Sequence, residues 1–123
     1  MKRREPIFLE PVFQEKIWGG DRLRTGFGYD IPSGHTGECW AISGHPGGDC
    51  RIKGRPGQTL GGLWRDERTL FGGLAGEGFP LLVKLLDARE DLSIQVHPDD
   101  SYARLHENGA SGKTECWYIL DCD

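Results

Sequence analysis

The sequence predicts a mainly β protein in which short antiparallel strands are joined by many turns and accompanied by a little helix. Glycine supplies 19 of the 123 residues, well above its usual share of roughly 7%. These glycines are spread between short apolar runs, a pattern typical of turns between strands rather than of a low-complexity linker. A chain of this length fits one domain, so we expect residues 1–123 to form a single domain.

The first third of the sequence predicts strand and loop. Apolar pieces between residues 7 and 23 are broken by Pro11 and by a glycine pair, which indicates an irregular or edge strand. Residues 29–37 combine proline, serine and glycine, so they are expected to form a loop. Residues 38–48 then predict a short strand that ends in a turn.

Two short helices are expected in the rest of the chain. The first opens after Thr59, a plausible N-cap, because apolar residues recur behind it at helical spacing until the glycine pair 72–73 ends the pattern. The second covers residues 99–109, with Asp99 or Asp100 capping its start and an Asn-Gly pair at its end.

Strands are expected around the second helix. Residues 80–88 form an apolar run of strand length that opens with a proline. Residues 93–100 follow so closely that 87–91 predict the connection of a hairpin. Residues 114–121 are aromatic and β-branched, which predicts a further strand after the helix.

Charge and composition exclude several classes of protein. The formal net charge of −4 argues against nucleic acid or an anionic membrane as the main partner. The sequence has no apolar run of about 18 residues, and its N-terminus lacks the apolar core of a signal peptide. We therefore expect a soluble, cytoplasmic protein. None of the four cysteines forms a C-x-x-C pair, so reduced thiols are expected rather than a zinc ribbon.

The segment GASGKT, residues 109–114, resembles the end of a phosphate-binding P-loop. The full motif requires a glycine at position 107, where this chain has Glu107. The flanks are also reversed, because a P-loop follows a strand and opens a helix. Here a helix is expected before the segment and a strand after it, so a nucleotide site is disfavoured.

Three polar residues on the expected strands could converge on a metal ion. In an extended segment Gln95 and His97 share a face with Cα atoms about 6.6–6.8 Å apart, and Pro98 favours an extended His97. Glu115 begins the next expected strand, so the three could supply nitrogen and oxygen donors. Residue types alone do not choose between zinc, manganese and iron. The alternative is a solvated polar face without a metal, the commoner setting of such residues.

Six segments carry a resemblance to a known family. They are IWGG (17–20), GYDIPSGHTGECWAISGHPGG (28–48), TLGGLW (59–64), LFGG (70–73), LLVKLLDAREDLSIQVHPDD (81–100) and GKTECWYILD (112–121). In these segments the chain resembles the type I mannose-6-phosphate isomerases, phosphomannose isomerases with a cupin fold, and most of all their short bacterial form. The last two segments are the most specific. The resemblance implies a mainly β, cupin-like jelly roll, here a partial barrel with short helices.

The resemblance also implies roles for five residues of this chain. Gln95, His97 and Glu115 match the positions that ligate zinc in the family. Lys113 matches a residue that faces the active site, where it would serve catalysis and substrate binding. Ser93 matches a serine that contacts the substrate phosphate or supports a ligand.

The implied function is a zinc-dependent aldose–ketose isomerase that interconverts mannose 6-phosphate and fructose 6-phosphate. Family members are longer, and they take a fourth zinc ligand, a histidine, and a catalytic arginine from beyond the point matching residue 123. We therefore expect a truncated, N-terminal part of such an enzyme, with a homodimer or a complementing C-terminal chain as a partner besides the sugar phosphate. The alternatives are a catalytically silent cupin module that binds metal or sugar phosphate, and a structural β domain without a site.

A short internal echo accompanies these motifs. Residues 36–42 and 113–119 both contain Glu-Cys-Trp, but two copies are too few to indicate a repeat architecture. Glu38 and Trp40, in the first copy, match a recurrent Glu-x-Trp segment of the family. Turn anchoring and packing are the expected roles of these two residues unless the structure places them at a site.

Overall fold

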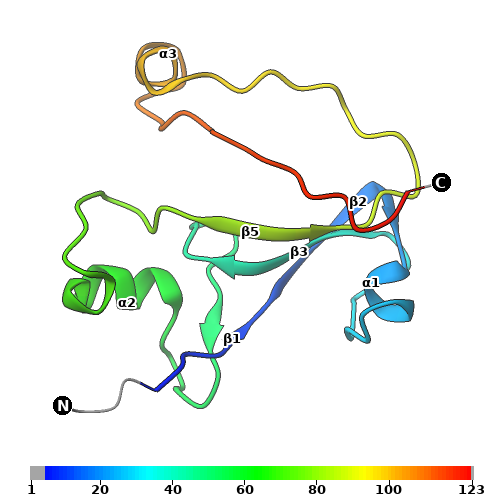
Figure 1. Cartoon of the computed structure of the whole chain (residues 1–123), viewed down its shortest axis with the longest axis horizontal. Coiled ribbons are helices and arrows are strands. Elements are labelled where there is room, and N and C mark those ends of the chain that lie inside the picture. The colour runs from blue at the N-terminus through cyan, green and yellow to red at the C-terminus, as the bar shows by residue number, and fades with distance from the viewer. Residues whose placement is uncertain (1–4, 123) are drawn as a thin grey trace. The chain divides into compact units, whose positions relative to one another are not determined.

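The computed structural model describes residues 5–122. Residues 1–4 lie outside this range. They begin the N-terminal segment in which no signal peptide is expected. The chain forms two compact units, Met1–Leu92 and Ser93–Asp123 (Figure 1). Unit 1 holds the strands, and unit 2 is built around one helix. Within residues 5–122 no helix has the length and apolar character needed to cross a membrane.

Unit 1 is organised around an antiparallel sheet of three strands. The order is β2 (Val12–Gly20), β3 (Thr36–Ser43) and β5 (Leu82–Leu86), with β3 in the centre (Figure 1). A second, two-stranded sheet pairs β1 (Leu9–Glu10) with β4 (Arg51–Ile52). The strands predicted at 38–48 and 80–88 are therefore confirmed. The irregular or edge strand predicted between residues 7 and 23 is also confirmed, because β2 lies at the edge of the sheet and its register with β3 shifts at Glu15.

A small apolar core lies beside the three-stranded sheet. Its buried members are Leu23, Ile31 and Cys39, with Phe13, Tyr29, Ala41 and Leu85 packed against them. Leu23 comes from α1 (Arg22–Thr25), a single helical turn. The buried carboxylate of Asp87 accepts a hydrogen bond of 2.7 Å from the backbone N–H of Arg22 and so fixes the start of this turn.

Part of the glycine content is explained by a close approach of β2 and β3. A Cβ atom on Gly19 would lie 2.4 Å from the backbone nitrogen of Gly37. A Cβ atom on Gly37 would lie 2.6 Å from the ring of Trp18. No larger side chain fits at either position without moving the backbone, so these glycines are required by the sheet itself.

Both predicted helices are confirmed, and each begins at a predicted cap. The helix α2 (Leu60–Asp66) begins after Thr59, whose hydroxyl accepts a hydrogen bond from the backbone of Gly62. It continues into a 3₁₀ turn, η1 (Arg68–Phe71), that ends at Gly72 with φ of 74°.

The helix α3 (Asp100–His106) is the one regular element described in unit 2. The carboxylate of Asp99 accepts a 2.8 Å hydrogen bond from the backbone N–H of Tyr102 and caps its start. Asn108 and Gly109 adopt φ of 53° and 83° after its end, as expected for an Asn-Gly pair that terminates a helix.

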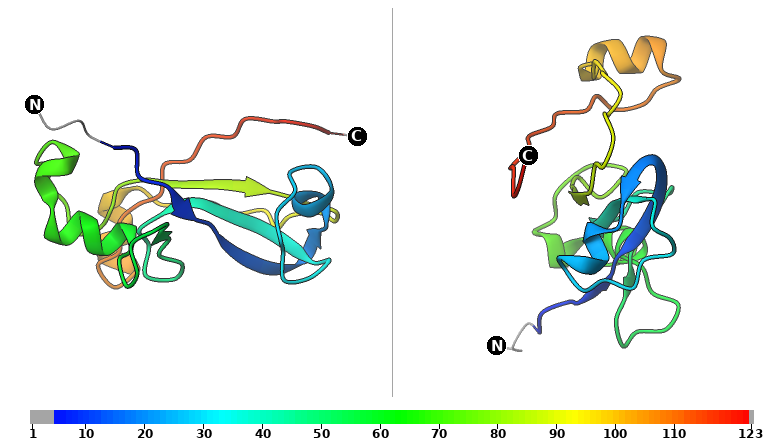
Figure 2. Two further views of the ribbon diagram at one scale, coloured as in Figure 1. Left: turned by 90° about the horizontal axis from the view of Figure 1, so that it is seen from below. Right: turned by 90° about the vertical axis from the view of Figure 1, so that its right-hand side faces the viewer.

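The strands predicted at 93–100 and 114–121 are wrong, and so is the hairpin predicted around 87–91. Figures 1 and 2 draw the segments on either side of α3 as coil without arrows, and within residues 5–122 no strand is assigned to them. A strand exists only where its backbone groups pair with a neighbour. Alternating side chains indicated an extended segment correctly but could not indicate whether a partner strand is present.

The mainly β fold class is confirmed, since sheets dominate unit 1 and the helices are short. Residues 5–122 contain no closed barrel. The prediction of one domain spanning residues 1–123 stays a prediction.

Candidate functional site

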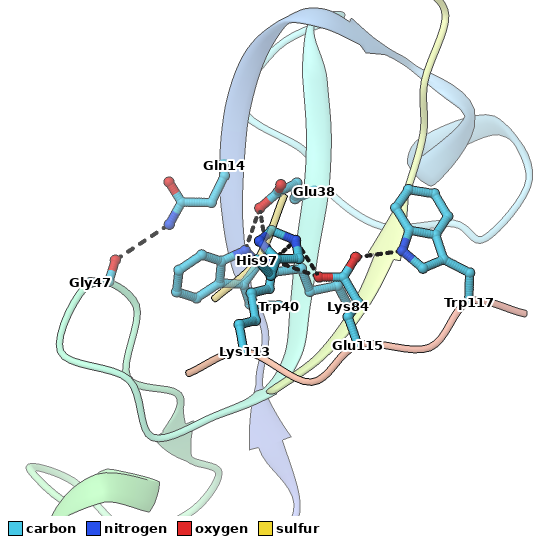
Figure 3. Close-up of polar contacts among 9 residues, drawn as sticks. All are labelled: Gln14, Glu38, Trp40, Gly47, Lys84, His97, Lys113, Glu115 and Trp117. Atoms are coloured by element: carbon cyan, nitrogen blue, oxygen red, sulfur yellow. Dashed lines mark hydrogen bonds and ion pairs between the residues drawn. The ribbon is translucent and has the colours of Figure 1, made fainter. Parts of the chain in front are cut away.

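Four side chains of unit 2 form a connected polar group, the His97 cluster: His97, Lys113, Glu115 and Trp117 (Figure 3). The Lys113 ammonium lies 2.6 Å from Oε2 of Glu115 and 3.2 Å from Nε2 of His97. Nε2 of His97 and Oε2 of Glu115 are 3.3 Å apart. The indole N–H of Trp117 donates a short hydrogen bond to the other oxygen of Glu115, Oε1.

The backbone around α3 brings the two ends of this cluster together. The backbone N–H of Lys113 donates to the carbonyl of Pro98 at 3.1 Å, and that of Gly112 donates to the Asp100 carboxylate at 2.9 Å. A Cβ atom on Gly112 would lie 2.5 Å from the carbonyl carbon of Asp99. Gly112 is therefore needed for close contact between the segments that carry His97 and Lys113.

Two atoms of the His97 cluster have the spacing of a pair of zinc ligands. Two ligand atoms that each lie about 2.0–2.1 Å from a tetrahedral zinc ion are about 3.3–3.4 Å apart. The separation of 3.3 Å between Nε2 of His97 and Oε2 of Glu115 matches this value. The Lys113 ammonium bridges the same two atoms, so the acceptors already face a common point occupied by positive charge.

The third predicted ligand, Gln95, is placed differently. Its amide Nε2 donates a 2.9 Å hydrogen bond to the hydroxyl of Ser93, and among the described residues it makes no hydrogen bond to the His97 cluster. The structure thus brings together two of the three predicted ligands, together with Lys113. Within residues 5–122 no three histidine, cysteine, aspartate or glutamate side chains gather as a metal site.

Hydrogen bonds from Lys113 and Trp117 hold the pKa of Glu115 below its ordinary value. The carboxylate is therefore ionised at neutral pH and carries the negative charge that offsets a bound cation.

A second polar group, the Glu38 cluster, lies in unit 1 and consists of Glu38, Trp40 and Lys84 (Figure 3). The indole N–H of Trp40 donates to Oε2 of Glu38 at 2.6 Å, and the Lys84 ammonium donates to the same oxygen at 3.1 Å. Lys84 also lies over the Trp40 ring, 5.0 Å from its centre. Trp40 and Lys84 are direct partners in the β3–β5 pairing, so the sheet register creates the cluster.

Burial by itself would raise the pKa of Glu38, whose residue is 8% exposed, but hydrogen bonds from Trp40 and Lys84 lower it further than burial raises it. The net pKa lies below the ordinary value, so the Glu38 carboxylate is ionised at neutral pH. Glu38 and Trp40 are thus joined in a charged cluster and are more than packing residues.

Two members of these clusters, Lys84 and Trp117, were not singled out from the sequence. Each had a signal. Lys84 is the one charged residue of the apolar run LLVKLL, residues 81–86. Trp117 belongs to the Glu-Cys-Trp echo, in which both tryptophans donate to the glutamate two residues before them.

The cysteines take no part in either cluster. Cys39 and Cys50 are buried free thiols, and burial raises the pKa of each. Cys116 and Cys122 are free and exposed. The expectation of reduced thiols agrees with these positions.

We expect Glu38→Gln to lower the free energy of unfolding by about 1–3 kcal/mol at pH 7, because Lys84 loses its carboxylate partner in a partly buried place. The folded pKa of Glu38 is depressed, so its stabilisation is complete above the unfolded pKa of about 4.3 and is lost as pH falls through the folded value. Urea unfolding at several pH values should show the two proteins converging in acid. Glu77→Gln, which changes an exposed loop carboxylate, is the control, and an equal effect from it would contradict the prediction.

Comparison with known proteins shows what class of protein this fold and these residues define. The family model described as "Phosphomannose isomerase type I, catalytic domain" matches residues 7–118. The chain therefore belongs to the type I phosphomannose isomerase family.

Individual relatives agree with this assignment. The chain is 62% identical over 119 residues to "Probable mannose-6-phosphate isomerase GmuF" of Bacillus subtilis (strain 168), which covers 95% of this chain and 38% of the relative. It is 58% identical to "Mannose-6-phosphate isomerase ManA" of the same organism, covering 96% of this chain and 38% of the relative. It is 54% identical to the mannose-6-phosphate isomerase of Streptococcus mutans serotype c, again covering 38% of the relative.

The backbone is also similar to a solved structure. The crystal structure of the mannose 6-phosphate isomerase from Bacillus subtilis superposes with a TM-score of 0.93 at 61% identity, covering 98% of this chain and 39% of that one. This likeness confirms the predicted cupin-like class with a partial barrel. The chain spans about 38% of the length of the curated relatives it matches.

Proposed function

We propose that this chain forms part of a zinc-dependent aldose–ketose isomerase that interconverts mannose 6-phosphate and fructose 6-phosphate. Its relatives carry the name of this isomerase. The observation that carries the proposal is the 3.3 Å separation of the His97 and Glu115 donor atoms, which suits two ligands of one zinc ion.

His97 and Glu115 would hold the ion, and Gln95 would complete a three-ligand set through its amide oxygen. The amide nitrogen of Gln95 is used in the hydrogen bond to Ser93, which leaves the oxygen as the donor for a cation. When bound, zinc would polarise the sugar carbonyl as a Lewis acid. Glu115 would offset part of its charge.

Lys113 would act on the substrate. Isomerisation moves a proton between C1 and C2, which requires a positioned base and stabilisation of charge on oxygen. In this structure the Lys113 ammonium lies 2.6 Å from Oε2 of Glu115 and 3.2 Å from Nε2 of His97. It would move away from these two atoms when a metal ion binds between them. Its charge would then face the substrate oxygens at short range, where it can carry a proton.

Ser93 would contact the substrate phosphate. Its oxygen accepts the hydrogen bond from Gln95, so its own O–H remains to donate to a phosphate oxygen. This arrangement would connect the phosphate contact to a metal ligand through one hydrogen bond. The sugar phosphate is accordingly the proposed partner of the site.

The organisation of the protein is part of the same proposal. One catalytic-domain model spans residues 7–118, which supports a single domain, and we place the protein in the cytoplasm. The proposed protein partner is a second copy of the chain, in a homodimer, or a complementing C-terminal chain. The second candidate is a silent cupin module that binds metal or sugar phosphate, favoured by the separate placement of Gln95.

We expect the 123-residue chain alone to bind zinc weakly and to show little or no isomerase activity. Three ligands, one of them a neutral glutamine, form a weak set, and only Glu115 offsets the charge of the ion. Elemental analysis after dialysis and a coupled assay with mannose 6-phosphate measure the two properties. Stoichiometric zinc with robust turnover by the chain alone would contradict this expectation.

The function itself is tested by joining the chain to the remaining part of the ManA relative from Bacillus subtilis. We expect the joined protein to isomerise mannose 6-phosphate and to lose this activity on removal of zinc by a chelator. A folded, zinc-loaded hybrid without activity would favour the silent module.

A further inference from the structure

The two Glu-x-Trp segments share one local contact. In each, the indole N–H donates to the carboxylate of the glutamate two residues earlier, Trp40 to Glu38 at 2.6 Å and Trp117 to Glu115. The first pair lies within strand β3, and the second lies in a segment without assigned strand. The contact therefore forms both inside a paired strand and outside one.

The two segments differ in which oxygen is used. At Glu38, Trp40 and Lys84 donate to the same oxygen, Oε2. At Glu115, the indole N–H of Trp117 donates to Oε1, while the Lys113 ammonium and Nε2 of His97 lie 2.6 and 3.3 Å from Oε2. The second segment thus divides the two oxygens of one carboxylate between an indole and a cation.

We propose that Trp117 is a positioning residue that holds Oε1 of Glu115 and so presents Oε2 alone to a cation beside His97. An ionised carboxylate can bind a cation through one or both oxygens, and a hydrogen bond to one oxygen selects the other. The metal aspect of this proposal rests on the proposed function. The contact between Trp117 and Glu115 stands on its own.

Packing does not account for Trp117. Its residue is 57% exposed, so burial of the ring contributes little to holding its segment in place. The hydrogen bond to an ionised carboxylate is the specific interaction that the side chain makes, and such bonds are stronger than those between neutral groups. Groups that hydrogen-bond to metal ligands change metal affinity by about 10–100-fold when removed.

The contact is tested first without any metal. The chain contains four tryptophans, so a ¹⁵N-labelled sample gives at most four indole N–H signals. We expect Glu115→Gln to shift the Trp117 indole signal and to leave the others in place. Glu38→Gln is the matched control and should shift the Trp40 signal alone. A Trp117 signal that ignores Glu115→Gln overturns the proposal.

The metal aspect is tested by calorimetric titration of the chain with zinc chloride. We expect Trp117→Phe, which removes the N–H and keeps an aromatic ring, to weaken zinc binding about 10–100-fold. Urea unfolding of the metal-free Trp117→Phe chain should match that of the wild type, because residue 117 is 57% exposed, whereas a merely structural role predicts a loss of stability. Tyr118→Phe, at the neighbouring exposed aromatic residue, should have no effect. Unchanged zinc affinity in Trp117→Phe overturns the proposal.

The same experiments separate this proposal from the proposed function. A wild-type chain that takes up no zinc refutes the metal site, and the response of the indole signal to Glu115→Gln then decides the contact by itself. A chain that binds zinc but lacks isomerase activity leaves the positioning role supported by the titration.

Discussion

His97→Ala is expected to remove most zinc binding, a loss of more than about 100-fold in affinity, since even groups that only support a ligand change affinity by about 10–100-fold. His97 supplies the one nitrogen donor of the proposed set. Its removal leaves Glu115 with Lys113, and that ion pair of 2.6 Å competes directly with a metal ion for the same oxygen. Calorimetric titration with zinc chloride measures the loss.

Two controls make this result specific. His106→Ala changes another histidine of unit 2, one that stacks on Tyr102 and contacts neither His97 nor Glu115 among the described residues. Cys50→Ala removes a buried thiol to which we assign no ligand role. Both variants should bind zinc with the affinity of the wild type in the same titration. Unchanged zinc affinity in His97→Ala would show that the ion binds elsewhere and would refute the proposed site.

The helices were predictable because their signals are local. Thr59 and Asp99 each accept a hydrogen bond from the backbone three residues ahead, and that contact requires only the residues of the first turn. The stops after these helices are equally local, since Gly72 and Gly109 adopt a positive φ that glycine tolerates without steric cost. Neither the start nor the end of these helices therefore depends on distant parts of the chain.

The strands around α3 were not predictable in the same way. The residues 93–97 alternate polar and apolar side chains, but pairing depends on a second segment that the alternation does not identify. Ile94 and Val96 are fully or almost fully exposed, at 101% and 94%. Nothing among the described residues covers these side chains, so the alternation by itself does not produce a strand.

The candidate site likewise combines residues that the sequence could predict with a residue whose role depends on a distant strand. His97 and Glu115 were expected together because of the family motifs, and the structure places them in contact distance. The role of Lys84 depends on the register of β3 and β5, which places it opposite Trp40. Sequence alone leaves that register open, because a shift by one residue would turn Lys84 to the other face.

Trp64→Ala is expected to lower the free energy of unfolding by about 3–5 kcal/mol, the usual loss when a large buried aromatic side chain is truncated. Trp64 lies on α2 and is 1% exposed. Its ring packs edge-on against Phe71 and Phe79, with ring centres 5.1 and 5.6 Å away, and Arg68 lies 4.3 Å over it. Since a domain is stable by only about 5–15 kcal/mol, this one change removes a large share of the total.

Trp64→Phe separates the ring from its N–H group. The indole nitrogen of Trp64 is buried and has no hydrogen-bond partner among the described residues, and an unsatisfied buried donor costs about 1–3 kcal/mol. Phenylalanine removes that donor and keeps much of the aromatic contact. Urea unfolding should therefore show a far smaller decrease in the free energy of unfolding for Trp64→Phe than for Trp64→Ala. If Phe and Ala destabilise equally, the N–H group has a partner, and the contribution assigned here to ring packing is wrong. The smaller loss with Phe would instead show that ring packing holds α2 and η1 against the loop that carries Phe79.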